Sequence, residues 1–197
     1  MKPVTVYAFR HGETDWNRDR RFQGHTDISL NEVGKYQAKA LAWQVREASP
    51  ETILSSDLMR AKETTEIVNQ WIQVPVIHSS KLRECKLGDP EGKTIESVIE
   101  QYGPQDWGRW RSALPQDLDF SFPNGETKRQ HLERMLNFIQ GFLLQQTHLE
   151  RIAISTHGGS LLRLVHHCIG APDSPIAIPN CALYRLTFLR NSQEWRY

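Results

Sequence analysis

Short apolar runs alternate with helix-like segments along this sequence, and that alternation constrains the fold more than any other feature. Five runs have the length and the β-branched or aromatic content of buried strands, at residues 4–9, 52–54, 74–77, 151–156 and 182–189. The intervening segments carry apolar residues at helical spacing, as the crossover connections of a parallel sheet do. The sequence therefore predicts an α/β fold, a three-layer α/β/α sandwich with a mostly parallel central sheet.

Start signals mark where several of the helices begin. Ser29-Leu30-Asn31-Glu32 has the form of a capping box, and Asp57 is the expected N-cap of the next helix. The Pro at position 75 pushes the strand at 74–77 toward a sheet edge, because proline has no amide hydrogen to donate. Helices are expected over residues 31–47, 57–71, 94–102 and 106–112, and after Thr127 and Gly159.

The size of the chain favours one domain. It has 197 residues, 39% of them hydrophobic, which is enough for a single ordinary core. Between about residues 82 and 125 the alternation is interrupted by turns around Gly88-Asp89-Pro90 and by the two short helices. We therefore expect a single domain over residues 1–197, with a loop and helix insertion at about 82–125 that covers the active site.

Composition narrows the classes of partner. The net charge is +1, so no polyanion-binding surface is indicated, and no run approaches the roughly 20 apolar residues that a membrane span needs. The three cysteines, Cys85, Cys168 and Cys181, have no CxxC spacing. We expect a cytoplasmic protein, a monomer or homodimer, that binds a small ligand rather than nucleic acid or a membrane.

Charged and nucleophilic side chains stand where three predicted strands end. Arg10-His11 follows the first strand, Arg60 lies in the first turn of the helix after the second, and His157-Gly158-Gly159 follows the strand at 151–156. The carboxyl ends of parallel strands share one edge of the sheet, which is where open α/β sheets bind ligands. Two guanidiniums, two imidazoles and a helix N-terminus would then surround one anion, because unpaired charges are too costly to bury without a ligand.

The motifs continue in order along nearly the whole chain. They are Arg10-His11-Gly12-Glu13-Thr14 with Asn17, Gln23-Gly24, Leu30 through Gly34, Ser55-Ser56-Asp57-Leu58 with Arg60, Leu82-Arg83-Glu84, Glu91-Gly92, Gly125-Glu126, Ser155-Thr156-His157-Gly158-Gly159 and Asn180-Cys181. With these residues the sequence resembles the histidine phosphatase superfamily, also called the phosphoglycerate mutase-like family. One departure is Asp89-Pro90 before Glu91, where the family usually has a tryptophan.

The resemblance implies a phosphohistidine mechanism without metal or cofactor. His11 would attack phosphorus, and Arg10, Arg60 and His157 would hold the phosphoryl oxygens. Neighbouring arginines favour a neutral His11, because like charges depress the pKa of an imidazole. Glu84 would give a proton to the leaving alcohol and then activate water. Asn17 would add a neutral donor, and Gln23, Gly24 and Gly158 complete the implied phosphate and substrate site.

Within that family the sequence favours a phosphatase acting on small phosphomonoesters. Cofactor-dependent mutases resemble this chain but have Thr-Gly at the place of Gln23-Gly24 and Arg-His-Tyr-Gly soon after the acid, where this chain has Cys85-Lys86-Leu87-Gly88. The alternatives are such a mutase and a catalytically silent protein that binds a phosphorylated ligand.

Several basic residues have no assigned role. Contacts to a second anionic group are open for Lys86, Lys93, Arg109 and Arg111, although a solvated basic face is the favoured interpretation. His25, in the loop beside Gln23-Gly24, is a candidate substrate contact. The other histidines, His78, His131, His148, His166 and His167, are interpreted as surface or structural residues.

Overall fold

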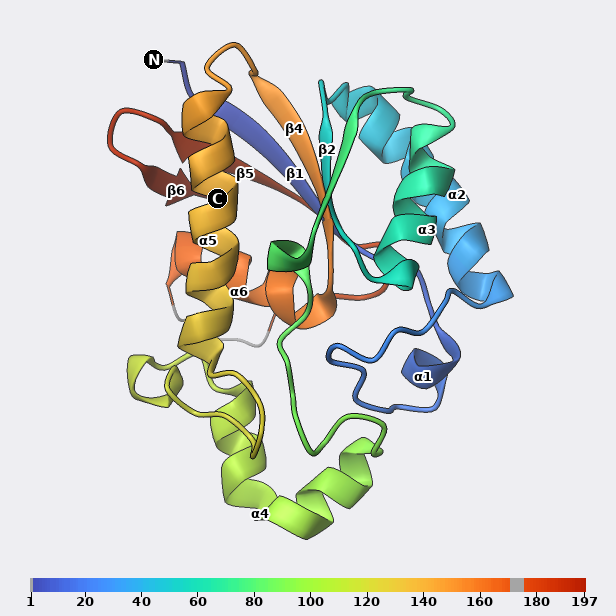
Figure 1. Cartoon of the computed structure of the whole chain (residues 1–197), viewed down its shortest axis with the longest axis vertical. Coiled ribbons are helices and arrows are strands. Elements are labelled where there is room, and N and C mark those ends of the chain that lie inside the picture. The colour runs from blue at the N-terminus through green and yellow to red at the C-terminus, as the bar shows by residue number, and fades with distance from the viewer. Residues whose placement is uncertain (1, 171–175) are drawn as a thin grey trace.

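A six-stranded sheet forms the centre of the computed structural model, which describes residues 2–170 and 176–197 (Figure 1). The strand order is β3-β2-β4-β1-β5-β6. β1 and β2 each pair in parallel with β4, β3 pairs in parallel with β2, and β5 and β6 are antiparallel. The strands are β1 Val4–Arg10, β2 Ile53–Ser56, β3 Val76–Ser79, β4 Arg151–Thr156, β5 Leu183–Leu189 and β6 Glu194–Arg196.

Helices cover both faces of this sheet, which confirms the predicted three-layer sandwich (Figure 1). On one face α5 and α6 pack over alternate residues of β1, such as Val6 and Ala8. On the other face α2 and α3 pack against Phe9 and its neighbours. The longer helices are α2 Glu32–Ala48, α3 Met59–Asn69, α4 Ile95–Arg111, α5 Lys128–Gln145 and α6 Gly158–Ile169, and the short ones are α1 Asp15–Arg18, η1 Ser80–Leu82 and η2 Pro115–Asp117.

Two of the predicted helix starts are wrong in detail. The cap of α2 is Asn31, whose side chain accepts the Gly34 amide, and not Ser29. Leu58 precedes α3 without any side-chain cap, because Asp57 instead accepts two hydrogen bonds from the Arg83 guanidinium. The edge position expected from the proline at residue 75 is confirmed, since β3 is an outer strand of the sheet.

The segment between η1 and α5 lies beyond one end of the sheet, at the bottom of Figure 1. The two short helices predicted there run together as α4, with a kink at Gly103, whose φ of 84° is left-handed. Buried Lys128 holds the end of α4, because its ammonium donates to the carbonyls of Arg109 at 2.6 Å and Ser112 at 2.7 Å. Burial lowers the pKa of Lys128 to about 8.

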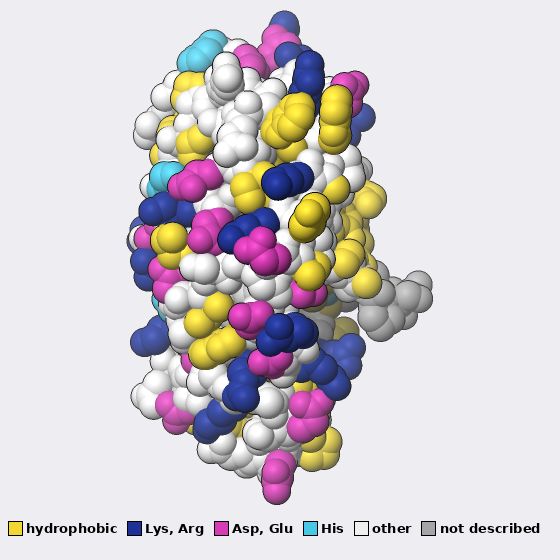
Figure 2. Space-filling model, turned by 90° about the vertical axis from the view of Figure 1, so that its right-hand side faces the viewer, with side chains coloured by type: hydrophobic (Ala, Val, Ile, Leu, Met, Phe, Trp, Pro, Cys, Tyr) yellow, Lys and Arg dark blue, Asp and Glu magenta, His cyan; other side chains and the backbone are white. Residues whose placement is uncertain are grey.

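The outer surface of α2 and α3 is mixed in character. Hydrophobic side chains there are interspersed with basic and acidic ones on the face shown in Figure 2. Trp43 of α2 and Trp71, which follows α3, are both about half exposed, and their rings lie 5.5 Å apart. Among the described residues, none of the helices has the length and apolar character that crossing a membrane requires.

Candidate active site

A cavity of about 310 Å³ opens at the carboxyl ends of β1 and β4. Its polar lining consists of Arg10, His11, Asn17, Arg21, Gln23, Arg60 and Glu84, together with the backbone of Gly24, Gly158 and Gly159. Apolar walls come from Phe22, Leu87, Trp110, Leu162, Ile176 and Ile178. Nearly all of the residues predicted to bind phosphate therefore line a single cavity, and His157 lies directly behind it.

His11 is held in a defined tautomer. Its ring is 3% exposed, and Nδ1 lies 2.6 Å from the carbonyl oxygen of Gly12. A carbonyl can only accept, so Nδ1 carries the hydrogen and Nε2 keeps a free lone pair. Burial, followed by the charges of Arg60 and Arg10, lowers the pKa of His11 well below its ordinary value. The imidazole is therefore neutral and has one nitrogen available for attack.

Arg60 connects the first turn of α3 to two other parts of the site. Its Nη2 donates to the carbonyl of Gly24 at 2.8 Å and its Nη1 to that of Thr26 at 2.9 Å. Its Nε donates to Nδ1 of His157 at 3.2 Å. The side chain is almost wholly buried, and this burial lowers the pKa of Arg60 to about 10, so the guanidinium stays charged at neutral pH.

His157 supports the cavity from behind. While Nδ1 accepts from Arg60, Nε2 lies 2.8 Å from the hydroxyl of Ser56 and donates to it. The ring is fully buried, and its centroid is 5.2 Å from that of His11. Burial first, and the charge of Arg60 second, lower the pKa of His157. Both nitrogens are therefore engaged by the protein, and the role of His157 as a phosphate ligand stays a prediction.

Arg10 lies close against the start of α6, where the first residue is Gly158. A Cβ on Gly158 would lie 3.2 Å from Nε of Arg10. One guanidinium nitrogen donates to the carbonyl of Ile178 at 2.6 Å, while the buried Nε has no hydrogen-bond partner among the described residues. An unsatisfied donor of this kind in a cavity wall is suited to an anionic ligand.

Asn17 and Gln23 contribute neutral polar groups. The Oδ1 atom of Asn17 accepts from the backbone amide of Thr14 at 3.1 Å and from Asn180 at 3.2 Å. These bonds orient Oδ1 away from a ligand and leave the amide hydrogens as the donors that can face one. Gln23 also lines the cavity, and its buried Oε1 has no hydrogen-bond partner among the described residues.

Glu84 presents its carboxyl group at the other side of the cavity. Oε1 accepts from the amide of Cys85 and Oε2 from the amide of Gly159, each at 2.8 Å. A Cβ on Gly159 would lie 2.6 Å from Oε1, so this approach requires a residue without a side chain. The predicted acid and the predicted nucleophile thus line the same cavity.

The loop around Gln23-Gly24 is organised by Glu91, a residue for which the sequence suggested no role. The Glu91 carboxylate accepts from the amides of His25, Thr26 and Leu87. A Cβ on Gly24 would lie 2.2 Å from Oε1 of Glu91. Glu91 therefore anchors this loop. In the sequence, its place in the Glu91-Gly92 motif was the only indication of such a role.

Some basic residues outside the motif pair with other side chains of the protein, whereas another lines the cavity. Lys93 pairs with Gln101, and Arg109 with Asp106 and Asp117. Of the basic residues beyond the motif, the one that lines the cavity is Arg21, which the sequence did not single out. The His25 ring contacts the protein itself, since its Nε2 lies 2.9 Å from the carbonyl of Glu84. Within the described chain, no group of three His, Cys, Asp or Glu side chains is placed to hold a metal ion.

Comparison with known proteins places this arrangement in context. The family model described as histidine phosphatase superfamily (branch 1) matches residues 6–197. An Escherichia coli relative named probable phosphoglycerate mutase GpmB is 32% identical over 188 residues, covering 94% of this chain and 85% of that protein.

Among solved structures, Bacillus stearothermophilus YhfR is 29% identical with a TM-score of 0.83 and coverage of 98% of this chain and 94% of that one. The α-ribazole phosphatase from Shigella flexneri is 28% identical with a TM-score of 0.70, over 86% and 81% of the two chains. A mycobacterial glucosyl-3-phosphoglycerate phosphatase is 24% identical and shares the fold, with a TM-score of 0.87 over 98% and 96% of the two chains.

Proposed function

Because the chain belongs to the histidine phosphatase superfamily, we propose that it is a phosphatase that hydrolyses small phosphomonoesters through a phosphohistidine on His11. The observation that carries this proposal is the buried, neutral His11, with its free Nε2 in a cavity that also contains two guanidiniums and a carboxyl group. These groups are a nucleophile, anion-stabilising cations and an acid, which together suffice for phosphoryl transfer.

The reaction would proceed in two displacements. In the first, Nε2 of His11 bonds to phosphorus, the ester P–O bond breaks, and protonated Glu84 gives its proton to the departing alkoxide oxygen. In the second, water attacks the phosphohistidine, Glu84 takes a proton from that water, and the P–N bond breaks to release phosphate. Arg10 and Arg60 stabilise the charge on the phosphoryl oxygens in both steps, and the scheme assigns no step to a metal or cofactor.

The experiment that tests this is phosphate release from p-nitrophenyl phosphate in excess chelator, comparing the native chain with His11→Ala. We expect steady turnover by the native chain and a loss of at least about 10³-fold in the variant, since a covalent nucleophile has no substitute. His148→Ala, at an exposed histidine, is the matched control and should keep native turnover. Binding of phosphate by a native chain without turnover would favour the catalytically silent alternative.

A phosphoglycerate mutase is the second candidate, because the Escherichia coli relative carries that name. A mutase has to hold a second anionic group of its substrate. The cavity wall beyond the phosphate site offers Arg21 as a cation but is otherwise largely apolar, with Phe22, Leu87 and Trp110. We therefore favour hydrolysis. Interconversion of 2- and 3-phosphoglycerate faster than phosphate release would reverse this preference.

A further inference from the structure

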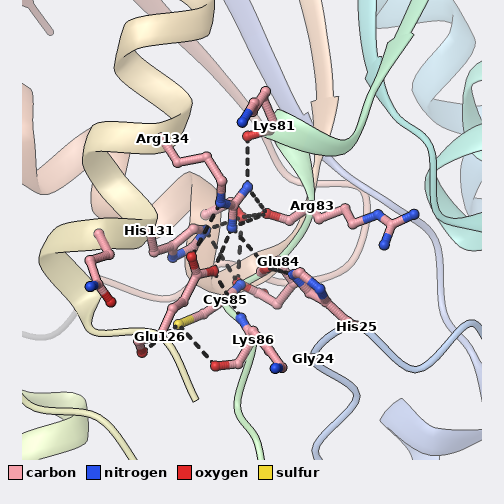
Figure 3. A network of polar contacts seen from close by, with 12 residues as sticks. Gly24, His25, Lys81, Arg83, Glu84, Cys85, Lys86, Glu126, His131 and Arg134 are labelled. Atoms are coloured by element: carbon pink, nitrogen blue, oxygen red, sulfur yellow. Dashed lines mark hydrogen bonds and ion pairs between the residues drawn. The ribbon is translucent and has the colours of Figure 1, made fainter. Parts of the chain in front are cut away.

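Helix α5 and the first turn of α6 build a polar network around Glu84 (Figure 3). His131 and Arg134 reach the network from α5, and Ser160 reaches it from α6. His131 and Ser160 are fully buried, in a part of the molecule where a polar side chain needs a partner.

The backbone of Glu84 is held by two side chains. The Arg134 guanidinium donates to the carbonyl of Glu84 at 3.2 Å and to that of Lys81 at 2.7 Å, and it forms an ion pair with Glu126. Nε2 of His25 donates to the Glu84 carbonyl at 2.9 Å. These contacts fix where the residue sits, but they do not touch the carboxyl group that would transfer the proton.

The carboxyl group is approached by a separate pair. Nε2 of His131 lies 2.9 Å from the hydroxyl of Ser160 and 3.9 Å from Oε1 of Glu84. The Ser160 hydroxyl is 3.4 Å from Oε1 of Glu84 and 3.4 Å from the carbonyl of Arg83. Serine has one hydrogen to give and two acceptors within reach, so it receives the hydrogen bond from His131 and donates onward.

The protonation state of His131 is consistent with a hydrogen bond donated from its ring to Ser160. Burial first, and then the charges of Arg163 and Arg134, lower the pKa of His131 well below its ordinary value. A neutral imidazole carries one N–H, and we assign it to Nε2 because the Ser160 hydroxyl has acceptors on its far side. The bonds then run from His131 to Ser160 and from Ser160 to the Glu84 carboxyl or the adjacent Arg83 carbonyl.

We propose that His131, acting through Ser160, is a positioning residue that orients the Glu84 carboxyl toward the leaving oxygen; this inference rests on the function proposed above. A general acid works only within hydrogen-bond reach of the atom it protonates, and a displacement of about 1 Å can cost about 10²-fold in rate. His131 is therefore more than a core residue, although it lies behind the cavity wall.

The test uses leaving groups that differ in their need for an acid. p-Nitrophenolate departs readily as an anion, whereas phenolate benefits more from a proton. For His131→Leu we expect kcat/KM to fall about 10²-fold with phenyl phosphate but less than about 5-fold with p-nitrophenyl phosphate, because kcat/KM reports the first displacement. The kcat should fall with both esters if water attack limits it, because that step uses the same carboxylate.

Two further variants make the result specific. His131→Gln can place an amide N–H near the position of Nε2 and should restore kcat/KM for phenyl phosphate to within about 5-fold of native, whereas Ser160→Ala should repeat the pattern of His131→Leu. Met135→Ala, one turn along α5 and equally buried, is the control for packing. It should lower thermal stability without changing the ratio between the two esters.

The outcomes separate the inference from the proposed function. No hydrolysis of either ester by the native chain would overturn the proposed function and the inference with it. Native hydrolysis together with an equal loss on both esters in His131→Leu would overturn the inference alone. If His131→Leu does not fold, Ser160→Ala decides, and a native ratio in that variant would overturn the inference.

Discussion

At the scale of single residues, Arg60 illustrates how neutral groups can satisfy the hydrogen bonds of a buried cation. Each nitrogen of its guanidinium donates to a neutral acceptor, two of them backbone carbonyls and the third the ring of His157. These bonds hold the plane of the side chain before any ligand arrives, so its charge needs no reorganisation during phosphoryl transfer. A lysine ammonium lacks the planar arrangement of donors that reaches these three acceptors at once.

Arg60→Lys should therefore retain the fold and lose activity. We expect kcat/KM for p-nitrophenyl phosphate to fall about 10²- to 10³-fold, the usual effect of removing one pre-organised donor. The exposed Arg129, which pairs with Asp119 on the surface, provides the control Arg129→Lys, expected to be unchanged. A change of less than about 3-fold in Arg60→Lys would show that the planar geometry is unimportant.

Which site residues could be predicted depends on their position relative to the strands. Arg10 and His11 stand at the end of β1, and Arg60 lies in the first turn of the helix after β2, so the chain pattern alone brings them to one edge. Arg21 and His131 could not be found in this way, because one lies in a long loop and the other on a helix far along the chain. Their places depend on tertiary packing, for which sequence spacing holds no signal.

At the scale of elements, α2 packs unusually close to the loop that follows β1. A Cβ on Gly12 would lie 2.4 Å from the carbonyl oxygen of Gly34, and one on Gly34 would lie 2.1 Å from that of Glu13. Backbone therefore meets backbone, with no side chain between them. This contact places the start of α2 beside the segment that carries His11.

Gly34→Ala should separate these two elements. We expect a loss of about 1–3 kcal/mol in the free energy of unfolding, the usual cost of overpacking, together with reduced turnover. Gly141→Ala is the matched control, because its added Cβ meets nothing within 4 Å inside α5. That substitution should stabilise by up to about 1 kcal/mol, since alanine favours helix. Urea unfolding measures both, and equal effects would contradict the close packing.

Element boundaries were less predictable than element types. The two helices expected over 94–102 and 106–112 are both present, and they join across the kink at Gly103 to form α4. β6 was not predicted, because three residues are too short for a periodic signal. All four parallel strands were predicted, but the bounds of the two short ones are shifted, from 52–54 to Ile53–Ser56 for β2 and from 74–77 to Val76–Ser79 for β3.

At the scale of the whole molecule, three buried imidazoles affect the pH dependence of folding. Burial lowers the pKa of His11, His131 and His157 well below the unfolded value of about 6.5. In each case the unfolded chain binds a proton that the folded chain does not. Their contribution to stability is therefore complete above pH 6.5 and is lost as the pH falls from there toward the folded values.

We expect the free energy of unfolding to decrease between pH 6.5 and 5.5, with a limiting slope of about 1.4 kcal/mol per pH unit for each buried histidine. Urea unfolding at several pH values measures this slope. His131→Gln should reduce the slope by the contribution of one histidine. His148→Gln, at an exposed position, should leave the slope unchanged. A free energy that is flat across this interval would show that these rings become protonated without unfolding.

The order of the strands also determines when the site can form during protein synthesis. β1 and β2 leave the ribosome early, but β4 lies between them in the sheet and is made about a hundred residues after β2. His11 follows β1, and Arg60 lies in the helix after β2; until residues 151–156 emerge, these two strands have no shared neighbour. Closing such distant contacts is slow and leaves strand edges unpaired in the meantime. The nascent chain therefore exposes these strand edges until its last quarter is made, and the site can form only then.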